Sequence, residues 1–564
     1  MKRVFILLLI TLLQATSLLA GQGVERTYLA TDREVYVAGD RVWCSAFCVD
    51  ASTGRLSNRS AIVYLELYSA ESRVQTAKIA LTEGRGAGSF ELPASIPTGN
   101  YRLVAYTAQN RAEPGFIPEG ASLKTLSVFN VLSRERVHKG VTVVSNEAYA
   151  GLLREAASRE DSAAAGLQVA VAEDSGSAET IPVSITCPGG AATLSVSVYC
   201  DDDLLRPVNP TVLDFGSDLR KAAGRKVEDA AAPEYEGEIL RARVKAEDAS
   251  GKPVDLAGRE LFLSVQGAGT GVYAARVDAA GRATFFTDVI FGDRELVCGL
   301  LGQDTVRSLT VEWESPYLGM APPTPPVLPL AECMAPALER RSVAMQIERR
   351  LSADTIPSAL RAPAHAWFGP NRVRYVLDDY TRFPLMKEVF TEFIQRIRVT
   401  GDNRRGHRLA LTPEDAYGNP LPSAHPTLVL LDGVPVSDHE QIYRYDPLLV
   451  QYIDLYPGRY LVGASYWDGV IQFITYKGNM PGFRMDAATG VSDYRGAAPP
   501  GLHRLFDPDH SLTVFWDPLV QVPSGETRVV PCRKPGYQGT FRIVVEGLTE
   551  SGTPVRSTAR ISVR

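Results

Sequence analysis

The sequence lacks the short motifs that mark common catalytic sites. It has no His-Glu-x-x-His zinc helix, no Gly-x-Ser-x-Gly nucleophile turn and no Gly-x-x-x-x-Gly-Lys-Ser/Thr phosphate loop. Its seven histidines are scattered, and none stands at metal-ligand spacing from a cysteine or another histidine. We therefore expect no enzyme activity, no metal and no cofactor.

Two kinds of partner are also disfavoured by what is missing. The net charge is −6 and no long basic segment occurs, so a nucleic-acid partner is not expected. Beyond the first twenty residues, no stretch approaches the ~18 apolar residues that a spanning helix needs. We expect no transmembrane segment in the mature chain.

Cysteine is scarce, and the count of seven is odd, so at least one thiol is free or intermolecular. Cys44 and Cys48 fall in one predicted strand, roughly 13 Å apart at ~3.3 Å per residue. A disulfide needs Cα atoms within about 7 Å. Cys187 and Cys200 flank a Pro-Gly-Gly turn, but counting outward from that turn places Cys187 opposite Ala192. We predict buried thiols and no disulfide framework.

The N-terminus has the pattern of a secretory signal peptide. Lys2 and Arg3 supply positive charge, residues 4–13 are apolar, and residues 17–21 offer small side chains for cleavage after Ala20 or Gly21. No cysteine stands at the cut, which disfavours a lipid anchor. We expect an exported protein, in the periplasm or associated with the outer membrane, with the cell surface also open.

Most of the remaining sequence consists of short alternating strands separated by Gly and Pro. The chain is longer than the ~250–300 residues of a single core, and the pattern predicts a mainly β fold of tandem sandwiches with one small α/β domain. The expected order is a signal peptide (1–20), β-sandwiches at 21–135, 136–232 and 233–315, a Pro-rich linker with a helix at 316–375, the α/β domain at 376–480, and a last sandwich at 481–564.

Residues 21–135 carry Thr31-Asp32, Tyr36 and Ala38-Gly39-Asp40, followed by Gly99-Asn-Tyr-Arg-Leu. This order resembles the macroglobulin-type domain, the sandwich module of the alpha-macroglobulin superfamily. The sandwich at 233–315 is similar to carboxypeptidase-regulatory-like or macroglobulin-like modules. The Cys-Gly-Glu-Gln thioester site of protease-trapping macroglobulins does not occur in this sequence.

The organising stretch is 426–478. The apolar run 428–431 stops at Asp432-Gly433, which predicts a buried strand entering a tight turn. Two further strands are expected, up to Pro457-Gly458 and over 469–476, and residues 384–397 have the apolar spacing of a helix. With Asp468-Gly469-Val-Ile and Lys477-Gly478, this order resembles the plug domain of TonB-dependent outer-membrane receptors. The sequence after Gly478 is too short for the receptors' barrel, so we expect a plug-like domain without it.

Segment 459–467 is predicted to be a loop between two of these strands, and it holds Tyr460, Tyr466 and Trp467. Exposed aromatic clusters are frequent contact anchors, so these three residues are the candidate partner contact. The alternative is that the rings fill a gap between the plug-like domain and the last sandwich.

The resulting hypothesis is a non-enzymatic, exported envelope protein that binds or scaffolds another outer-membrane or surface component. The alternative is a protease-binding or host-interaction factor of macroglobulin type that works without a thioester.

Overall fold

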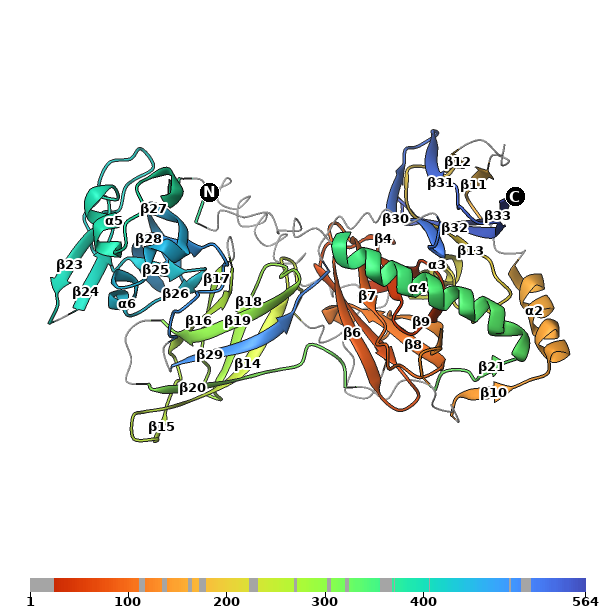
Figure 1. Ribbon diagram of the computed structural model, residues 1–564, viewed down its shortest axis with the longest axis horizontal. Helices are drawn as coiled ribbons and strands as arrows, with labels where there is room; N and C mark the ends of the chain where they lie inside the picture. The colour runs from red at the N-terminus through yellow and green to blue at the C-terminus, as the bar shows by residue number, and fades with distance from the viewer. Residues whose placement is uncertain are drawn as a thin grey trace, which may run out of the picture. The chain divides into compact units, whose positions relative to one another are not determined.

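The computed structural model describes residues 25–563 apart from these segments: 111–116, 134–138, 161–164, 172–178, 223–231, 268–270, 302–305, 320–323, 356–367, 370, 405, 486–487 and 499–508. The predicted signal peptide lies outside the described residues. The chain forms two compact units, and the described part is mostly strand, which confirms the predicted fold class (Figure 1). Unit 1 comprises Met1–Tyr235, Tyr317–Leu360 and Ala497–Arg564, and unit 2 comprises Glu236–Pro316 and Arg361–Gly496.

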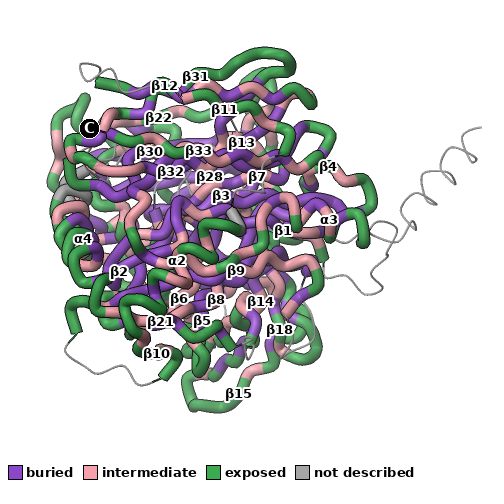
Figure 2. Tube along the Cα trace, turned by 90° about the vertical axis from the view of Figure 1, so that its right-hand side faces the viewer, coloured by how far each residue is buried: buried purple, intermediate pink, exposed green. Residues whose placement is uncertain are grey.

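Unit 1 begins with a β-sandwich whose two sheets enclose an apolar core. The central strand β3 is buried along nearly its whole length, as Figure 2 shows in purple. One sheet is β1(Glu25–Thr31), β3(Arg41–Asp50), β4(Arg55–Leu56) and β7(Arg85–Glu91). The other has the order β2(Val35–Val37), β9(Ser122–Phe129), β8(Gly99–Tyr106), β5(Ile62–Tyr68) and β6(Arg73–Ala80).

The macroglobulin-like motif of this sandwich forms a buried cluster of hydrogen-bonded polar side chains. Tyr36 OH lies 2.8 Å from Asp32 Oδ1, and Arg33 forms an ion pair with Asp40 at 2.8 Å. The Asp40 carboxylate also accepts the Val37 N–H at 2.8 Å. Because buried charges are costly unless paired and hydrogen-bonded, these residue types are required together at this turn.

A second sandwich of unit 1 corrects the predicted domain order. One sheet runs β30(Thr513–Val522), β13(Ala192–Cys200), β32(Gly539–Thr549), β33(Pro554–Val563), and the other runs β11(Gln168–Val171), β12(Thr180–Thr186), β31(Thr527–Arg533). The ranges 136–232 and 481–564 were predicted as two separate sandwiches, but their strands pair with each other. The strand β13 lies in the range 136–232, but both of its edges are hydrogen-bonded to strands of the range 481–564, β30 on one side and β32 on the other.

Helices and short strands complete unit 1. They are α2(Asn146–Glu160), α3(Val212–Ala222), α4(Ala335–Thr355), the 3-10 helices η1(Ala108–Asn110) and η2(Glu332–Met334), and the parallel pair β10(Val141–Val143) and β21(Leu328–Leu330). The helix α4 lies within the range 316–375, for which a helix was predicted. Buried Arg341 donates to Val35 O of the first sandwich at 2.7 Å and to the carboxylate of Asp202, just after β13 of the second sandwich, at 2.7 Å.

Unit 2 contains a third sandwich that is completed from far along the chain. Its sheets are β15(Pro253–Val254), β14(Ile239–Glu247), β18(Arg282–Phe286) with β20(Ser308–Trp313), and β17(Val272–Arg276), β16(Glu260–Val265), β19(Asp293–Leu300), β29(Thr489–Arg495). The strand β29 belongs to the range predicted as the last sandwich. It pairs with β19 over seven residues instead, so the α/β domain is inserted into the third sandwich.

The inserted α/β domain has the predicted strands in a mixed sheet of order β22(Val373–Val376), β27(Val450–Val462), β28(Ser465–Thr475), β25(Leu428–Leu431), β26(Val434–Pro435). Around it lie α5(Met386–Glu392), α6(His439–Tyr443), η3(Leu377–Asp379), η4(Pro447–Leu449) and the hairpin β23(Arg398–Asp402)–β24(Gly406–Ala410). Asp432 and Gly433 both adopt positive φ, 47° and 84°, as the predicted tight turn requires.

The helix of this domain is shorter than predicted. The helix predicted over 384–397 ends at Glu392, where Phe393 leaves helical geometry. Residues 428–431 form the predicted buried strand, and β25 lies between β28 and β26 and is buried on both faces. Consecutive residues of a strand point to opposite faces, so only a covered interior strand can bury all four.

The cysteine prediction is confirmed for the described residues except that Cys333 is not buried. All seven cysteines are free thiols, and all except the exposed Cys333 are buried. Cys44 and Cys48 point into the core of the first sandwich from the same face of β3, as their spacing predicted.

Candidate functional site

The segment predicted as the loop 459–467 is a continued β-hairpin. The strands β27 and β28 remain paired from Arg459↔Asp468 to Val462↔Ser465. The Pro457-Gly458 step does not end the strand, because a register shift between Tyr456 and Arg459 absorbs it as a bulge. The three candidate aromatic residues therefore sit on regular strands.

Strand parity separates the three aromatic residues. Tyr460 pairs with Trp467, and Leu461 pairs with Tyr466, so the two pairs point to opposite faces of the hairpin. Tyr460 and Trp467 pack against the core of the α/β domain. Tyr466 and Leu461 are 53% and 59% exposed, and the Tyr466 ring lies 5.4 Å from the His425 ring.

Polar contacts hold this hairpin in place. The Ala464 N–H and the Ser465 hydroxyl donate to the two oxygens of Glu260, at 2.6 and 3.0 Å. At the other end, the buried Asp468 carboxylate accepts from Arg459 Nε at 2.7 Å, and these contacts lower the pKa of Asp468 despite its burial. The exposed pair Leu461–Tyr466 is thus presented on a fixed support.

A cavity of about 670 Å³ opens in unit 2, where the third sandwich meets the α/β domain. Its apolar walls include Phe262, Leu300 and Val429, with Trp467, Phe483 and Met485. Small-molecule sites usually enclose about 300–1,000 Å³ with mostly apolar walls and a few polar groups. The size of this cavity falls in that range, and its lining combines polar and apolar groups.

The lining also contains charged and polar side chains. Arg307, Arg408, Asp438 and His439 all contribute to it. The Nδ1 of His439 accepts the Leu409 N–H at 3.1 Å. Burial, together with the charge of Arg408, lowers the pKa of His439 to about 4. At neutral pH the ring is therefore uncharged, and its proton is on Nε2.

Trp467 links the cavity to the predicted contact segment. Its indole Nε1 is buried and has no hydrogen-bond partner within the described part of the chain. A buried donor without an acceptor costs about 1–3 kcal/mol. Trp467 thus lines the cavity with its ring, while its indole N–H is itself buried.

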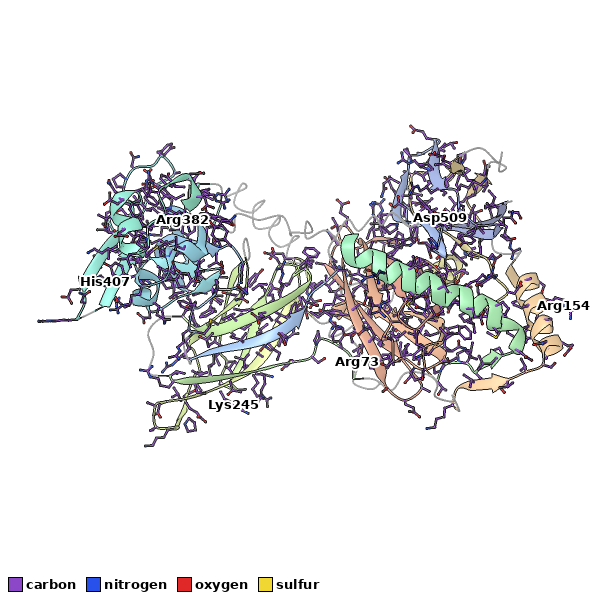
Figure 3. The ribbon with its side chains drawn as sticks, in the orientation of Figure 1. Arg73, Arg154, Lys245, Arg382, His407 and Asp509 are labelled. Atoms are coloured by element: carbon purple, nitrogen blue, oxygen red, sulfur yellow. The ribbon has the colours of Figure 1, made fainter. Side chains whose placement is uncertain are left out.

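A second polar cluster fixes the helix α6 next to the cavity. Glu440 accepts the backbone N–H of His407 at 2.7 Å, and the His407 Nδ1 lies 2.8 Å from the same oxygen. Hydrogen bonds from Arg444 and His407 lower the pKa of Glu440 to about 2. His407, labelled in Figure 3, also stacks on Tyr443 at 3.8 Å. This network is internal and joins β24 to α6.

Sequence reasoning identified Tyr466 and Trp467 but missed the cavity. The lining residues extend from Phe262 to Thr489 in the sequence, and no local pattern connects them. The sequence does show two adjacent aromatic residues near Pro457-Gly458, but this pattern indicates only the hairpin and not the other residues that line the cavity.

Two features are absent from the described residues. No group of three or more His, Cys, Asp or Glu side chains there is placed to hold a metal ion. No helix in that part of the chain is both long and apolar enough to cross a membrane.

These observations define a multi-sandwich β protein with an inserted α/β domain. Residues 26–116 match the family model of the MG2 domain, which confirms a macroglobulin-type domain in the first sandwich. The match covers most of the predicted range 21–135 and none of the α/β domain. The plug-like resemblance therefore stays a prediction.

Comparison with solved structures finds bacterial alpha-2-macroglobulins. Trypsin-activated alpha-2-macroglobulin from Escherichia coli is 8% identical, with 96% of this chain and 42% of that chain covered and a TM-score of 0.24. The native Escherichia coli protein is 8% identical, with 97% of this chain and 40% of that chain covered and a TM-score of 0.24. The Salmonella protein reacted with methylamine is 11% identical, with 96% of this chain and 24% of that chain covered and a TM-score of 0.16. The present chain thus spans less than half of those chains. No curated protein matches the sequence.

Proposed function

We propose that this chain is an exported, non-enzymatic protein of a Gram-negative cell envelope. It binds or scaffolds another outer-membrane or surface protein through its macroglobulin-like and plug-like domains. The observation that carries the proposal is the exposed pair Leu461–Tyr466, which the hairpin β27–β28 presents on a fixed support. An apolar pair that is already ordered before binding loses little entropy when a partner covers it.

Export is supported by the sequence alone. Lys2 and Arg3 followed by the apolar residues 4–13 have the order of a secretory leader. The macroglobulin-type domain at residues 26–116 supports a binding role, because sandwich modules commonly serve as supports for contact surfaces.

The test is an affinity capture from envelope membranes with identification of the captured proteins by mass spectrometry. The double variant Leu461→Ala, Tyr466→Ala should recover at least tenfold less of the main partner, with an unchanged melting temperature. Tyr417 is 91% exposed elsewhere on the α/β domain, so Tyr417→Ala is the matched control and should capture normally. Equal capture by the double variant and the control would contradict the proposed surface.

A second candidate function is favoured by the MG2 match. The chain would then be a protease-binding or host-interaction factor that acts without a covalent thioester. Size-exclusion chromatography with trypsin separates the two candidates. A stable complex with the protease favours this second function, whereas separate elution together with capture of an envelope protein favours the first.

A further inference from the structure

The hairpin β23–β24 of the α/β domain has an outer edge that no other strand of the described chain covers. The two strands form a sheet of their own, and all five residues of β23 are exposed (Figure 1). The strand β24 is supported on its other side by α6. There the His407 N–H donates to the Glu440 carboxylate at 2.7 Å, and the Leu409 N–H donates to His439 Nδ1 at 3.1 Å. The strand β23 is therefore the outermost strand of this ribbon.

The contacts of β24 with α6 determine which backbone groups of β23 face outward. In an antiparallel pair, opposite residues alternate between pairs that exchange both backbone hydrogen bonds and pairs that exchange none. Because the N–H groups of His407 and Leu409 donate to α6, both residues belong to the second kind of pair. Their partners across the ribbon are Gly401 and Val399. The N–H and C=O groups of Val399 and Gly401 therefore point away from β24, and they form no hydrogen bond within the described chain.

Free backbone groups at a strand edge are a template for a further strand. An extended peptide that adds to such an edge is held by main-chain hydrogen bonds. The strand β23 contains no proline and pairs with β24 without a register shift. Its outer edge is thus able to accept a third strand.

Arginine side chains determine the kind of segment that fits this edge. Residues 396–408 contain five arginines, of which Arg405 lies outside the described residues, and one aspartate. The exposed Arg398 donates to the Ser423 hydroxyl at 3.2 Å. Within the described chain, neither Arg398 nor Arg404 forms an ion pair. The aspartate, Asp402, accepts the backbone N–H of Arg404 at 2.8 Å.

The acidic side chains that contact this ribbon from outside are already paired. Glu414 forms an ion pair with Arg396 at 3.1 Å, and Glu440 accepts hydrogen bonds from His407 and Arg444. The charge that is left for a partner at this edge is therefore positive, and it favours acidic side chains on an incoming strand. Two copies of this chain paired edge to edge would bring their arginines together, which disfavours a second copy as the partner.

We propose that the outer edge of β23 binds an extended, acidic segment of another protein as a third strand of the ribbon. Main-chain hydrogen bonds to Val399 and Gly401 hold the segment, and charge-assisted contacts with Arg398 and Arg404 select its acidic side chains. This edge lies on other strands than the Leu461–Tyr466 surface. The inference goes beyond the proposed function and stands whether or not that surface binds a protein.

The test uses defined peptides and the purified exported protein. The first peptide is acetylated and amidated Glu-Val-Thr-Val-Glu-Val-Thr-Glu, and the second has lysine in place of each glutamate. In fluorescence anisotropy of the labelled peptides, the acidic one should bind at least tenfold more tightly. It should also slow hydrogen exchange in the segment 396–410. A third peptide has the acidic side chains but a methyl group on every backbone nitrogen, and it should not bind because it has no N–H to donate.

Variants of the chain separate backbone pairing from charge. Val399→Pro removes an outward N–H without removing a hydrogen bond to β24, and it should weaken binding of the acidic peptide at least tenfold at an unchanged melting temperature. Val399→Thr keeps the N–H and should bind like the wild type. Arg398→Glu should remove the preference for the acidic peptide. Arg528→Glu, the same charge change at an exposed position of unit 1, should keep it.

Vesicles of phosphatidylglycerol address the alternative that the arginines bind an anionic lipid surface. Binding of these vesicles without binding of the acidic peptide would overturn the proposal. Equal affinity for the acidic and the lysine peptide, or for the acidic and the methylated peptide, would also overturn it. The same holds for undiminished binding of the acidic peptide in both Val399→Pro and Arg398→Glu.

Discussion

Truncation of Phe473 tests the packing of the α/β domain most directly. The side chain is 0% exposed and lies on β28, between Leu431 of β25 and Ile453 of β27. Its ring is 6.2 Å from the ring of Phe390 on α5. Hydrogen-bonded strands flank it on both sides, so the space left by Phe473→Ala cannot close without moving the sheet. Core Phe→Ala changes cost about 3–5 kcal/mol, and we expect about 4 kcal/mol here.

Hydrogen exchange read by mass spectrometry is the suitable assay, because a chain of two units need not unfold in one step. In Phe473→Ala, the free energy of opening measured for peptides covering β27 and β28 should fall by about 4 kcal/mol. Peptides from β3 in unit 1 should exchange as in the wild type. Phe473→Leu is the conservative control and should cost less than about 1.5 kcal/mol. A loss below about 1 kcal/mol for Phe473→Ala, or equal losses in both units, would refute the assigned core.

The contact with Phe390 is tested by the double variant. Aromatic pairs contribute about 0.5–1.5 kcal/mol beyond area burial, so the losses of Phe390→Ala and Phe473→Ala should not be additive. Strict additivity would contradict the ring contact.

Three further predictions concern other groups. Because the folded pKa of His439 is about 4 and the unfolded pKa is about 6.5, the unfolded chain takes up the proton first. Stability should therefore fall by about 1–3 kcal/mol from pH 6.5 to 4 and not change above pH 6.5, and pH-dependent denaturation of His439→Gln should lack this slope. In the native protein only Cys333 should react quickly with a maleimide, and peptide mapping of a second fast thiol would contradict the burial of the other six. Asp432 accepts the Thr475 N–H at 2.7 Å and the Thr475 hydroxyl at 2.6 Å. Asp432→Ala leaves both donors buried without an acceptor, at about 1–3 kcal/mol for each, so it should lower the free energy of unfolding by several kcal/mol. Asp432→Asn keeps one acceptor oxygen and should cost clearly less. Equal melting temperatures for the two Asp432 variants would contradict that reasoning.

Local features of the fold could be predicted from the sequence. The Asp432-Gly433 turn was predictable because few residues adopt positive φ without strain. The free thiols Cys44 and Cys48 followed from strand parity and the reach of a disulfide. The polar cluster around Asp32 and Tyr36 was recognisable as a macroglobulin-type motif, since its members lie within ten residues of one another.

The candidate site was predictable only in part. The aromatic residues of the hairpin were visible in the sequence, but their roles depended on whether Pro457-Gly458 ended a strand or formed a bulge. The bulge keeps the strands paired, and pairing puts Tyr466 outside and Trp467 against the core. That outcome depends on hydrogen bonds to β28, which residue order alone does not reveal.

The sequence by itself determined the strands, the tight turns, the state of the cysteines and the presence of a macroglobulin-type domain, because each is set by neighbours within a few residues. Only the tertiary structure decided that β13 pairs with β30 and β32, that β29 completes the third sandwich, and that residues from Phe262 to Thr489 enclose one cavity. The physical reason is that a strand edge can accept any partner that satisfies its backbone groups. The choice among distant partners depends on burial summed over the whole unit, to which no short segment contributes a decisive signal.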